Sequence, residues 1–271
     1  MGLRINTNVS ALNTSRVLRR STGALNKTLE RLSSGLRINR AADDAAGLAI
    51  AEGFRAQVRG TQVAQRNSQD GISLVQTAEG ALSETTNILQ RIRELAVQAA
   101  NGTQSSSNRT ALNNEVLQLL AQIDDIALDT EFNGINVLSA AQTVTLQAGA
   151  KPGQTLAIGV SGAKTSDLKI TGVRVSDMVS AVSAISIVDN ALKSVNSLRS
   201  DFGAYQNRLE FTINTLAIQE ENSSASESAI RDADIAQETI AFTRNQILVS
   251  AGTSVLAQAN VVPQTALQLL G

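Results

Sequence analysis

The chain has 271 residues, with 23 basic and 24 acidic side chains and a formal net charge of −1. It contains no cysteine and no histidine, which excludes disulfides, thiolate nucleophiles and the side chain used most often as a general base or metal ligand. We therefore expect no catalytic residues, no metal site and no cofactor. The balanced charge gives no basic footprint for nucleic acid, and no run approaches the roughly 18 apolar residues of a membrane span.

The composition favours long helices over a thick globular interior. Aromatic residues make up only 2% of the chain, and the only prolines are Pro152 and Pro263. A core of leucine, isoleucine, valine and alanine suits helices packed side by side, and so few prolines leave them unbroken. Residues 1–8 have no apolar stretch of the kind found in secretory signal peptides, so we expect any export to proceed without a cleaved signal peptide.

The first predicted helix covers about residues 8–36. An apolar stripe with a seven-residue repeat runs along it, made by Leu18, Leu25, Leu32 and, at alternate positions, Leu29 and Leu36. Ser33, Ser34 and Gly35 interrupt the pattern. A second helical run begins near Asp43 and Asp44, because acidic side chains favour a helix N-terminus.

A long helix is predicted over residues 57–100, followed by a second helix over 110–128. The second helix has apolar residues spaced four and three apart, which is the coiled-coil period: Leu112, Val116, Leu119, Ile123 and Ile126. Turn-forming residues lie between the two helices and again at Asn133 and Gly134. The pattern predicts an antiparallel helical pair.

The middle of the chain changes character. Residues 143–147 and 155–160 alternate as strands do, and a turn around Pro152 separates them, so we predict a β-hairpin. Residues 168–175 are a candidate for one more short strand. A helix is then predicted over 177–222, with a strict heptad of buried positions: Val188, Val195, Phe202, Leu209 and Leu216.

The last predicted helix covers residues 230–270, after a polar, serine-rich stretch at 220–228 that reads as a linker or bend. Its apolar side is predicted to comprise Ile240, Ile247, Leu248, Val255 and Leu256. No charged residue occurs from 245 to 271, so this helix needs an apolar partner, and the stripe of the first helix fits. Two narrow helices still leave apolar surface, and we infer that many copies pack these paired ends together.

Several stretches resemble one known family, bacterial flagellin. Near the N-terminus the matching stretches are Ile5-Asn6-Thr7-Asn8, Glu30-Arg31-Leu32-Ser33-Ser34-Gly35-Leu36 and Asp43-Asp44-Ala45-Ala46-Gly47. Further matches are Arg91-Ile92-Arg93-Glu94-Leu95-Ala96, Phe132-Asn133-Gly134 and Ser228-Ala229-Ile230-Arg231-Asp232-Ala233. The middle of the chain is too short for the family's variable outer domains, so the resemblance implies a minimal flagellin.

The resemblance implies a mainly α fold of long antiparallel coiled-coil helices with a small β-hairpin insert and paired N- and C-terminal helices. Residues 1–42 and 227–271 would form the inner terminal domain, and residues 43–226 the rod domain, with the hairpin region at about 140–176. The implied function is that of a secreted, non-enzymatic, extracellular subunit that self-assembles into the flagellar filament for motility. The implied partners are other copies of the chain, the flagellar export apparatus, a chaperone, and the cap and hook-junction proteins.

The resemblance also points to two sets of contact residues. Arg31, Arg37, Asp43 and Asp44 are either register-fixing contacts between subunits or ordinary surface charges. Gln90, Arg91 and Leu95 match a motif that Toll-like receptor 5 reads in many flagellins, and Gln122 replaces a family glutamate in the facing helix. The alternative for these residues is simple packing between neighbouring rods.

Other classes of protein fit the sequence less well. A hook–filament junction protein shares the terminal motifs, but the strength of the central motifs favours flagellin. A signalling coiled coil of the chemoreceptor type would need transmembrane segments or a long symmetric hairpin. An enzyme would have to act without histidine or cysteine.

Overall fold

The computed structural model describes residues 7–268, which form two compact units by their internal contacts. Within the described residues, one unit comprises 7–56 and 222–268, and the other comprises 57–221. The domain boundaries predicted from the sequence, at 42/43 and 226/227, stay a prediction. The fold is mainly α with a small antiparallel strand pair, as expected.

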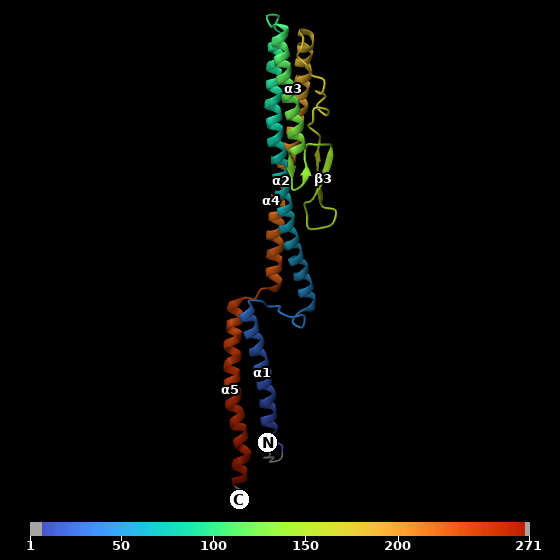
Figure 1. The fold of residues 1–271 in the computed structure, drawn as a ribbon. Coiled ribbons are helices and arrows are strands. Elements are labelled where there is room, and N and C mark those ends of the chain that lie inside the picture. The colour runs from blue at the N-terminus through green and yellow to red at the C-terminus, as the bar shows by residue number, and fades with distance from the viewer. Residues whose placement is uncertain (1–6, 269–271) are drawn as a thin grey trace. The chain divides into compact units, whose positions relative to one another are not determined.

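The helices and strands follow one another in a simple order. They are α1 (Val9–Ser34), α2 (Ala45–Ala100), α3 (Ser106–Asp129), β1 (Glu131–Phe132), β2 (Ile135–Asn136), β3 (Gln142–Gln147), β4 (Thr155–Val160), α4 (Met178–Arg231) and α5 (Ile235–Gln268). Figure 1 shows α1 and α5 side by side, with both termini at the same end of the pair.

Local signals set the ends of α1. The Asn8 side chain accepts a hydrogen bond from the backbone N–H of Ala11 at 3.0 Å, which satisfies a donor that the first turn leaves free. At the other end Gly35 adopts a left-handed conformation with φ 71°, and its N–H donates to the Arg31 carbonyl oxygen at 2.8 Å. A side chain at residue 35 would strain that conformation, which is why the helix ends at a glycine.

Three expectations about local structure were wrong. The helical run predicted to begin near Asp43 and Asp44 starts at Ala45 and forms one continuous helix, α2, with the run predicted at 57–100, because no proline lies between them. The serine-rich stretch at 220–228 is not a bend and continues α4 for the same reason. Residues 168–175 form no strand, although Leu168, Ile170, Val173 and Val175 in this segment are buried.

The larger unit is built on α2 and α4, which run antiparallel. Near the end of α2 and the start of α4, Arg93 pairs with Asp189 at 2.7 Å. Nearer the start of α2 and the end of α4, Gln62 donates to Glu220 at 2.6 Å. The core contains all of the predicted α4 heptad, with Val188, Val195, Phe202, Leu209 and Leu216 between 0% and 5% exposed. This heptad prediction is confirmed.

The helix α3 folds back beside α2 and holds the irregular segment 161–177. The Asp124 carboxylate accepts hydrogen bonds from both the backbone N–H and the hydroxyl of Thr165, at 2.8–3.0 Å. The Asn113 side chain accepts from the Val175 N–H at 2.9 Å. These two side chains replace the strand partner that the segment lacks.

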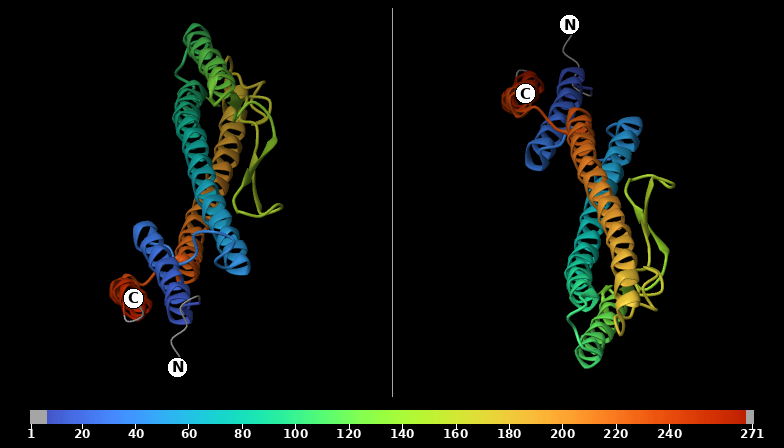
Figure 2. Two further views of the ribbon diagram at one scale, coloured as in Figure 1. Left: turned by 90° about the horizontal axis from the view of Figure 1, so that it is seen from below. Right: turned by 90° about the horizontal axis from the view of Figure 1, so that it is seen from above.

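The predicted hairpin is present as β3 and β4, with Gln142 opposite Val160 and Gln147 opposite Thr155. It lies along one side of the helices in both views of Figure 2. Its inner face is apolar, and Leu146 packs so closely on Gly71 of α2 that a β-carbon there would collide with it. The turn at residues 151–154 is exposed and is held by its own hydrogen bonds, including Lys151 N–H to the Gln154 side chain at 3.0 Å.

One described helix, α4, contains an 18-residue window with a mean hydropathy of 1.3, enough in length and composition to cross a membrane. Core helices of soluble proteins pass the same test, and α4 supplies a large part of this core. The expectation that the chain has no membrane span therefore stays a prediction.

Candidate assembly surface

The helices α1 and α5 pack against each other as an antiparallel pair, as predicted. At one end the Asn8 side chain donates to the Ala259 carbonyl oxygen at 2.7 Å, and at the other Arg31 pairs with Glu238 at 2.7 Å. Between them Gly252 lies so close to Leu18 that an added β-carbon would be 3.2 Å from the Leu18 Cδ1 atom. Glycine here permits close approach of the two helices.

The pair divides the predicted assembly residues into two groups. Half-buried residues between or beside the helices are Leu18, Leu25, Leu32, Leu36 and Leu256. Exposed residues are Leu29 at 53%, Ile240 at 62%, Ile247 at 62%, Leu248 at 48% and Val255 at 55%. Most of the apolar side predicted for the last helix therefore faces away from α1 within this subunit.

Sequence reasoning missed some members of each group. Phe242 and Val249 are half-buried, and with Leu256 they repeat every seven residues, a signal that was available in the sequence. Val9, Leu12 and Val17 of α1 are exposed by 55–66%, so the first helix also carries outward apolar side chains. Both helices thus have one apolar seam against each other and a second apolar surface left open.

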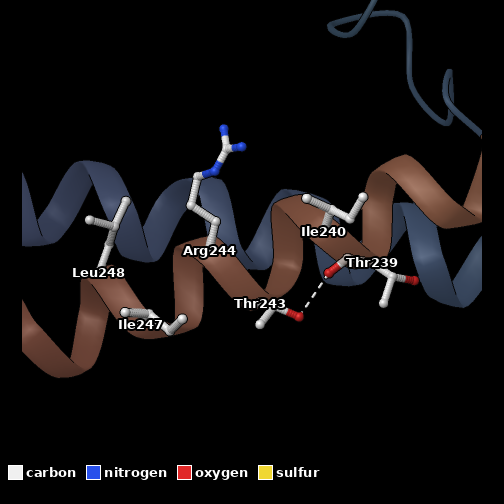
Figure 3. Close-up of a pocket in the computed structure, with 6 residues that line it drawn as sticks. All are labelled: Thr239, Ile240, Thr243, Arg244, Ile247 and Leu248. Atoms are coloured by element: carbon white, nitrogen blue, oxygen red, sulfur yellow. Dashed lines mark hydrogen bonds between the residues drawn. The ribbon is translucent and has the colours of Figure 1, made fainter.

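A shallow groove of about 430 Å³ lies on the exposed face of α5. Its lining residues are Thr239, Ile240, Thr243, Arg244, Ile247 and Leu248. Figure 3 shows them in rows along the helix, with Arg244 between Ile240 and Leu248 and with the Thr243 hydroxyl bonded to the Thr239 carbonyl oxygen. The groove is lined mainly by apolar atoms and offers no cluster of groups for chemistry.

The four proposed register residues all have contacts inside their own subunit. The Arg37 guanidinium donates to the Ile230 carbonyl oxygen at 2.5 and 3.2 Å, and Asp44 accepts from the Gly47 N–H at 2.9 Å near the start of α2. Arg31 pairs with Glu238, and Asp43 pairs with Lys27 at 2.8 Å. These contacts fix the segment 35–44 against α1 and against residues 230–232.

The electrostatics of Asp43 explain why this arrangement holds at neutral pH. The hydrogen bond from Lys27, together with the backbone N–H groups of Arg40 and Asn39, lowers the pKa of the Asp43 carboxyl from 3.8 to about 2. A lowered pKa means that the favourable contribution is present above the unfolded value and is lost as the pH falls toward the folded one. The carboxylate of Asp43 therefore remains available to pair with Lys27 below the pH at which a free aspartate becomes protonated.

The predicted receptor residues lie on α2 and α3. Gln90 and Arg91 are exposed, and Arg91 pairs with Glu115 of α3 at 2.8 Å and with Glu94 at 3.2 Å. The hydrogen bond that Arg91 donates to the Glu115 carboxylate is the main reason that the pKa of Arg91 is raised. By contrast, Leu95 is only 1% exposed and belongs to the core.

The replacement at Gln122 lies away from the ion pair that Arg91 makes within the subunit. Gln122 is exposed, but the residue of the facing helix that meets Arg91 is Glu115, which keeps its carboxylate. The role of Gln122 in a receptor contact therefore stays a prediction.

Residues 5–143 match the bacterial flagellin N-terminal helical region, and residues 185–270 match the bacterial flagellin C-terminal helical region. The chain belongs to the flagellin family. It is 49% identical to a flagellin of Halalkalibacterium halodurans over 98% of this chain and 99% of that protein. It is 45% identical to the flagellar filament 31.3 kDa core protein of Treponema maltophilum, with the same coverage of both chains.

A solved structure of a putative flagellar hook-associated protein from Vibrio parahaemolyticus resembles the chain with a TM-score of 0.60. It covers 70% of this chain and all of that one at 11% identity, which is a likeness of fold alone. Family membership makes the chain a structural subunit of the extracellular flagellar filament and not an enzyme. The chain covers 99% of both relatives, and its length of 271 residues fits a flagellin of minimal form.

Proposed function

We propose that copies of this chain polymerise through the outward faces of the α1–α5 pair and so form the filament that serves motility. The observation that carries the proposal is the second apolar surface of the pair, which includes Leu29, Ile240, Ile247, Leu248 and Val255. Monomeric soluble proteins rarely leave such contiguous apolar surface exposed. Packing against other copies would remove it from water.

The same surface suggests that assembly and ordering are coupled. A pair of narrow helices buries little apolar area, while fixing each residue costs on the order of 1–2 kcal/mol. Burial is worth only about 25 cal/mol per Å², so the isolated pair is marginal. We infer that both ends are largely unfolded in the monomer and become ordered when neighbouring copies cover them.

This coupling is consistent with the partners proposed for the chain. A chain with unfolded ends and no disulfides suits passage through a narrow export apparatus, escorted by a chaperone. Because the first copy has no neighbours to cover its ends, polymerisation needs the hook-junction proteins as a seed and a cap at the tip. We retain the division into an inner terminal domain (1–42 and 227–271) and a rod domain (43–226) as part of this proposal.

Electron microscopy of purified protein seeded with sheared filament fragments tests the proposal. The full chain should elongate the seeds into uniform tubes, and a variant truncated after Arg244 should not, because it lacks most of α5. The truncated variant should keep the unfolding transition of the unit formed by residues 57–221, which serves as the folding control. Elongation by the truncated variant at the rate of the full chain would contradict the proposal.

We further propose that Toll-like receptor 5 contacts the exposed side chains of Gln90 and Arg91 on α2 and of Gln122 on α3. Because Leu95 is buried, it would support the receptor site by packing beneath Arg91 and not by direct contact. An Arg91→Glu variant should signal through the receptor at least about tenfold more weakly, as expected when like charges meet across an interface. Unchanged signalling in a receptor reporter assay would remove this partner.

A further inference from the structure

The charges of the α1–α5 pair are unevenly distributed along its length. Residues 7–29 include Arg16, Arg19, Arg20 and Lys27 and contain no acidic residue. The facing stretch of α5, residues 239–268, has Arg244 as its only charged residue. The middle of the pair is therefore basic, and its acidic residues gather at the end where α1 leaves for residues 35–44.

Few of these basic side chains are neutralised within the subunit. Lys27 pairs with Asp43, and Arg16 donates to the Asn13 side chain at 2.9 Å. Within the described part of the chain, the exposed side chains of Arg19 and Arg20 have no hydrogen-bond or ion-pair partner. We call these two residues the basic stripe of α1.

One carboxylate at the acidic end also has no hydrogen-bond or ion-pair partner within the described residues. In the described part of the smaller unit, the other acidic side chains have ion pairs or bond to backbone N–H groups near helix starts, as Asp234 does with Ala236 at 2.9 Å. The exposed side chain of Asp232 has no such partner. The backbone of Asp232 pairs with that of Leu36, which fixes its position just beyond the end of α1.

These positions constrain how two copies can meet. If neighbouring pairs packed in register, the basic stripe would face a stretch of α1 or α5 that contains no carboxylate, and like charges would approach one another. Only a neighbour shifted along the helix axis brings an acidic side chain to the stripe. Asp232 lies at the level of residue 36, some 16 residues beyond the stripe, which at 1.5 Å per residue is roughly 25 Å.

We propose that Arg19 and Arg20 of one copy form ion pairs with Asp232 of a second copy that is displaced by about 25 Å along the pair. The proposal rests on assembly through the α1–α5 pair and adds the feature that sets its axial stagger. The outward apolar side chains occur along both helices, so packing between them does not select one axial displacement of a neighbouring copy. The ion pair supplies the register, because the neighbouring carboxylates at this end, such as Glu30, Glu238 and Asp43, are already paired within their own subunit, whereas that of Asp232 is not.

Seeded elongation of charge-reversal variants tests the pairing. Arg19→Glu/Arg20→Glu and, separately, Asp232→Lys should each raise the critical concentration for elongation by about tenfold or more, because each places like charges at the contact. The combined triple variant restores opposite charges and should return to within about threefold of the unaltered chain. Lys193→Glu/Arg208→Glu changes the net charge equally at exposed side chains of the other unit and is the matched control.

The dependence of elongation on salt provides a second readout, because salt should affect the unaltered chain and the charge-reversal variant in opposite directions. Added sodium chloride screens the contact, so elongation by Arg19→Glu/Arg20→Glu should improve relative to the unaltered chain as salt rises. Failure of the triple variant to recover, or normal elongation by both separate variants, would overturn the pairing while leaving assembly through the pair intact. Failure of the unaltered chain to elongate seeds would instead remove the proposed function.

The competing occupant of the stripe is an anionic lipid surface, which basic amphipathic helices also bind. Cosedimentation with phosphatidylserine vesicles distinguishes the two. Vesicle binding that Arg19→Glu/Arg20→Glu abolishes, together with normal elongation by that variant, would assign the stripe to lipid and overturn the pairing between copies.

Discussion

A Phe202→Ala variant should lose about 3–5 kcal/mol of unfolding free energy in the unit formed by residues 57–221, the cost of emptying a well-packed aromatic site. Phe202 is 1% exposed and is the largest fully buried side chain in the described residues. It occupies the middle of the α4 heptad, inside the buried core, so its removal leaves a cavity. Urea unfolding followed by far-ultraviolet circular dichroism measures the loss.

Phe211, on the same helix, provides the matched control. It is 72% exposed, so Phe211→Ala makes the same chemical change without a cavity and should alter the unfolding free energy by no more than about 0.5 kcal/mol. Equal losses in the two variants would show that helix propensity or the unfolded state determines the effect. Packing around Phe202 would then not be the source of stability.

A Gly252→Leu variant should elongate filament seeds at a critical concentration about tenfold higher than the unaltered chain. A β-carbon at residue 252 would already lie 3.2 Å from the Leu18 Cδ1 atom, and a leucine adds three further carbons in the same space. Overpacking of this kind costs about 1–3 kcal/mol, and 1.4 kcal/mol corresponds to a factor of ten. Sedimentation of polymer from monomer measures the critical concentration.

The control for Gly252 is Gly80→Leu. Gly80 is exposed on α2, and nothing lies within 4 Å of a β-carbon built there, so the same substitution has room. Because the monomer is expected to have unfolded ends, Gly252→Leu should leave its urea transition unchanged. A lower transition midpoint for Gly252→Leu would mean that the α1–α5 pair is already folded in the monomer, against the proposed coupling.

The buried face of α4 could be predicted from the sequence, whereas that of α5 could not. In α4 a strict seven-residue repeat of large apolar residues runs along the helix and marks one face for burial. In α5 almost every face is apolar or small, since residues 245–268 carry no charge. The apolar repeat of α5 shows that the helix has more apolar surface than one partner can cover, but it does not show which side meets α1. In the structure the half-buried residues on the side of α5 toward α1 are Phe242, Val249 and Leu256.

The other features that could not be predicted from the sequence depend on contacts between residues that lie far apart in it. In α3, Leu120 and Ala127 are buried, while Leu119 is only partly so, because the core reaches α3 from α2 and from segment 161–177 together. Within that segment, residues 168–175 resemble a strand in sequence, because apolar and polar residues roughly alternate there. The side chains of Asn113 and Asp124 accept hydrogen bonds from this segment and lie 62 and 41 positions away from their partners, a distance at which no local pattern carries information.

The exposed turn between β3 and β4 has a practical consequence. Residues 151–154 are bonded to one another, and the ladder that joins the strands ends before them at Gln147 and Thr155. Extra chain inserted at such a loop tip costs little more than its own closure entropy. In a polymer every copy presents this turn, so a short foreign peptide placed there would be repeated at the regular spacing of the subunits. The turn is thus a suitable site for building an ordered display array from this chain.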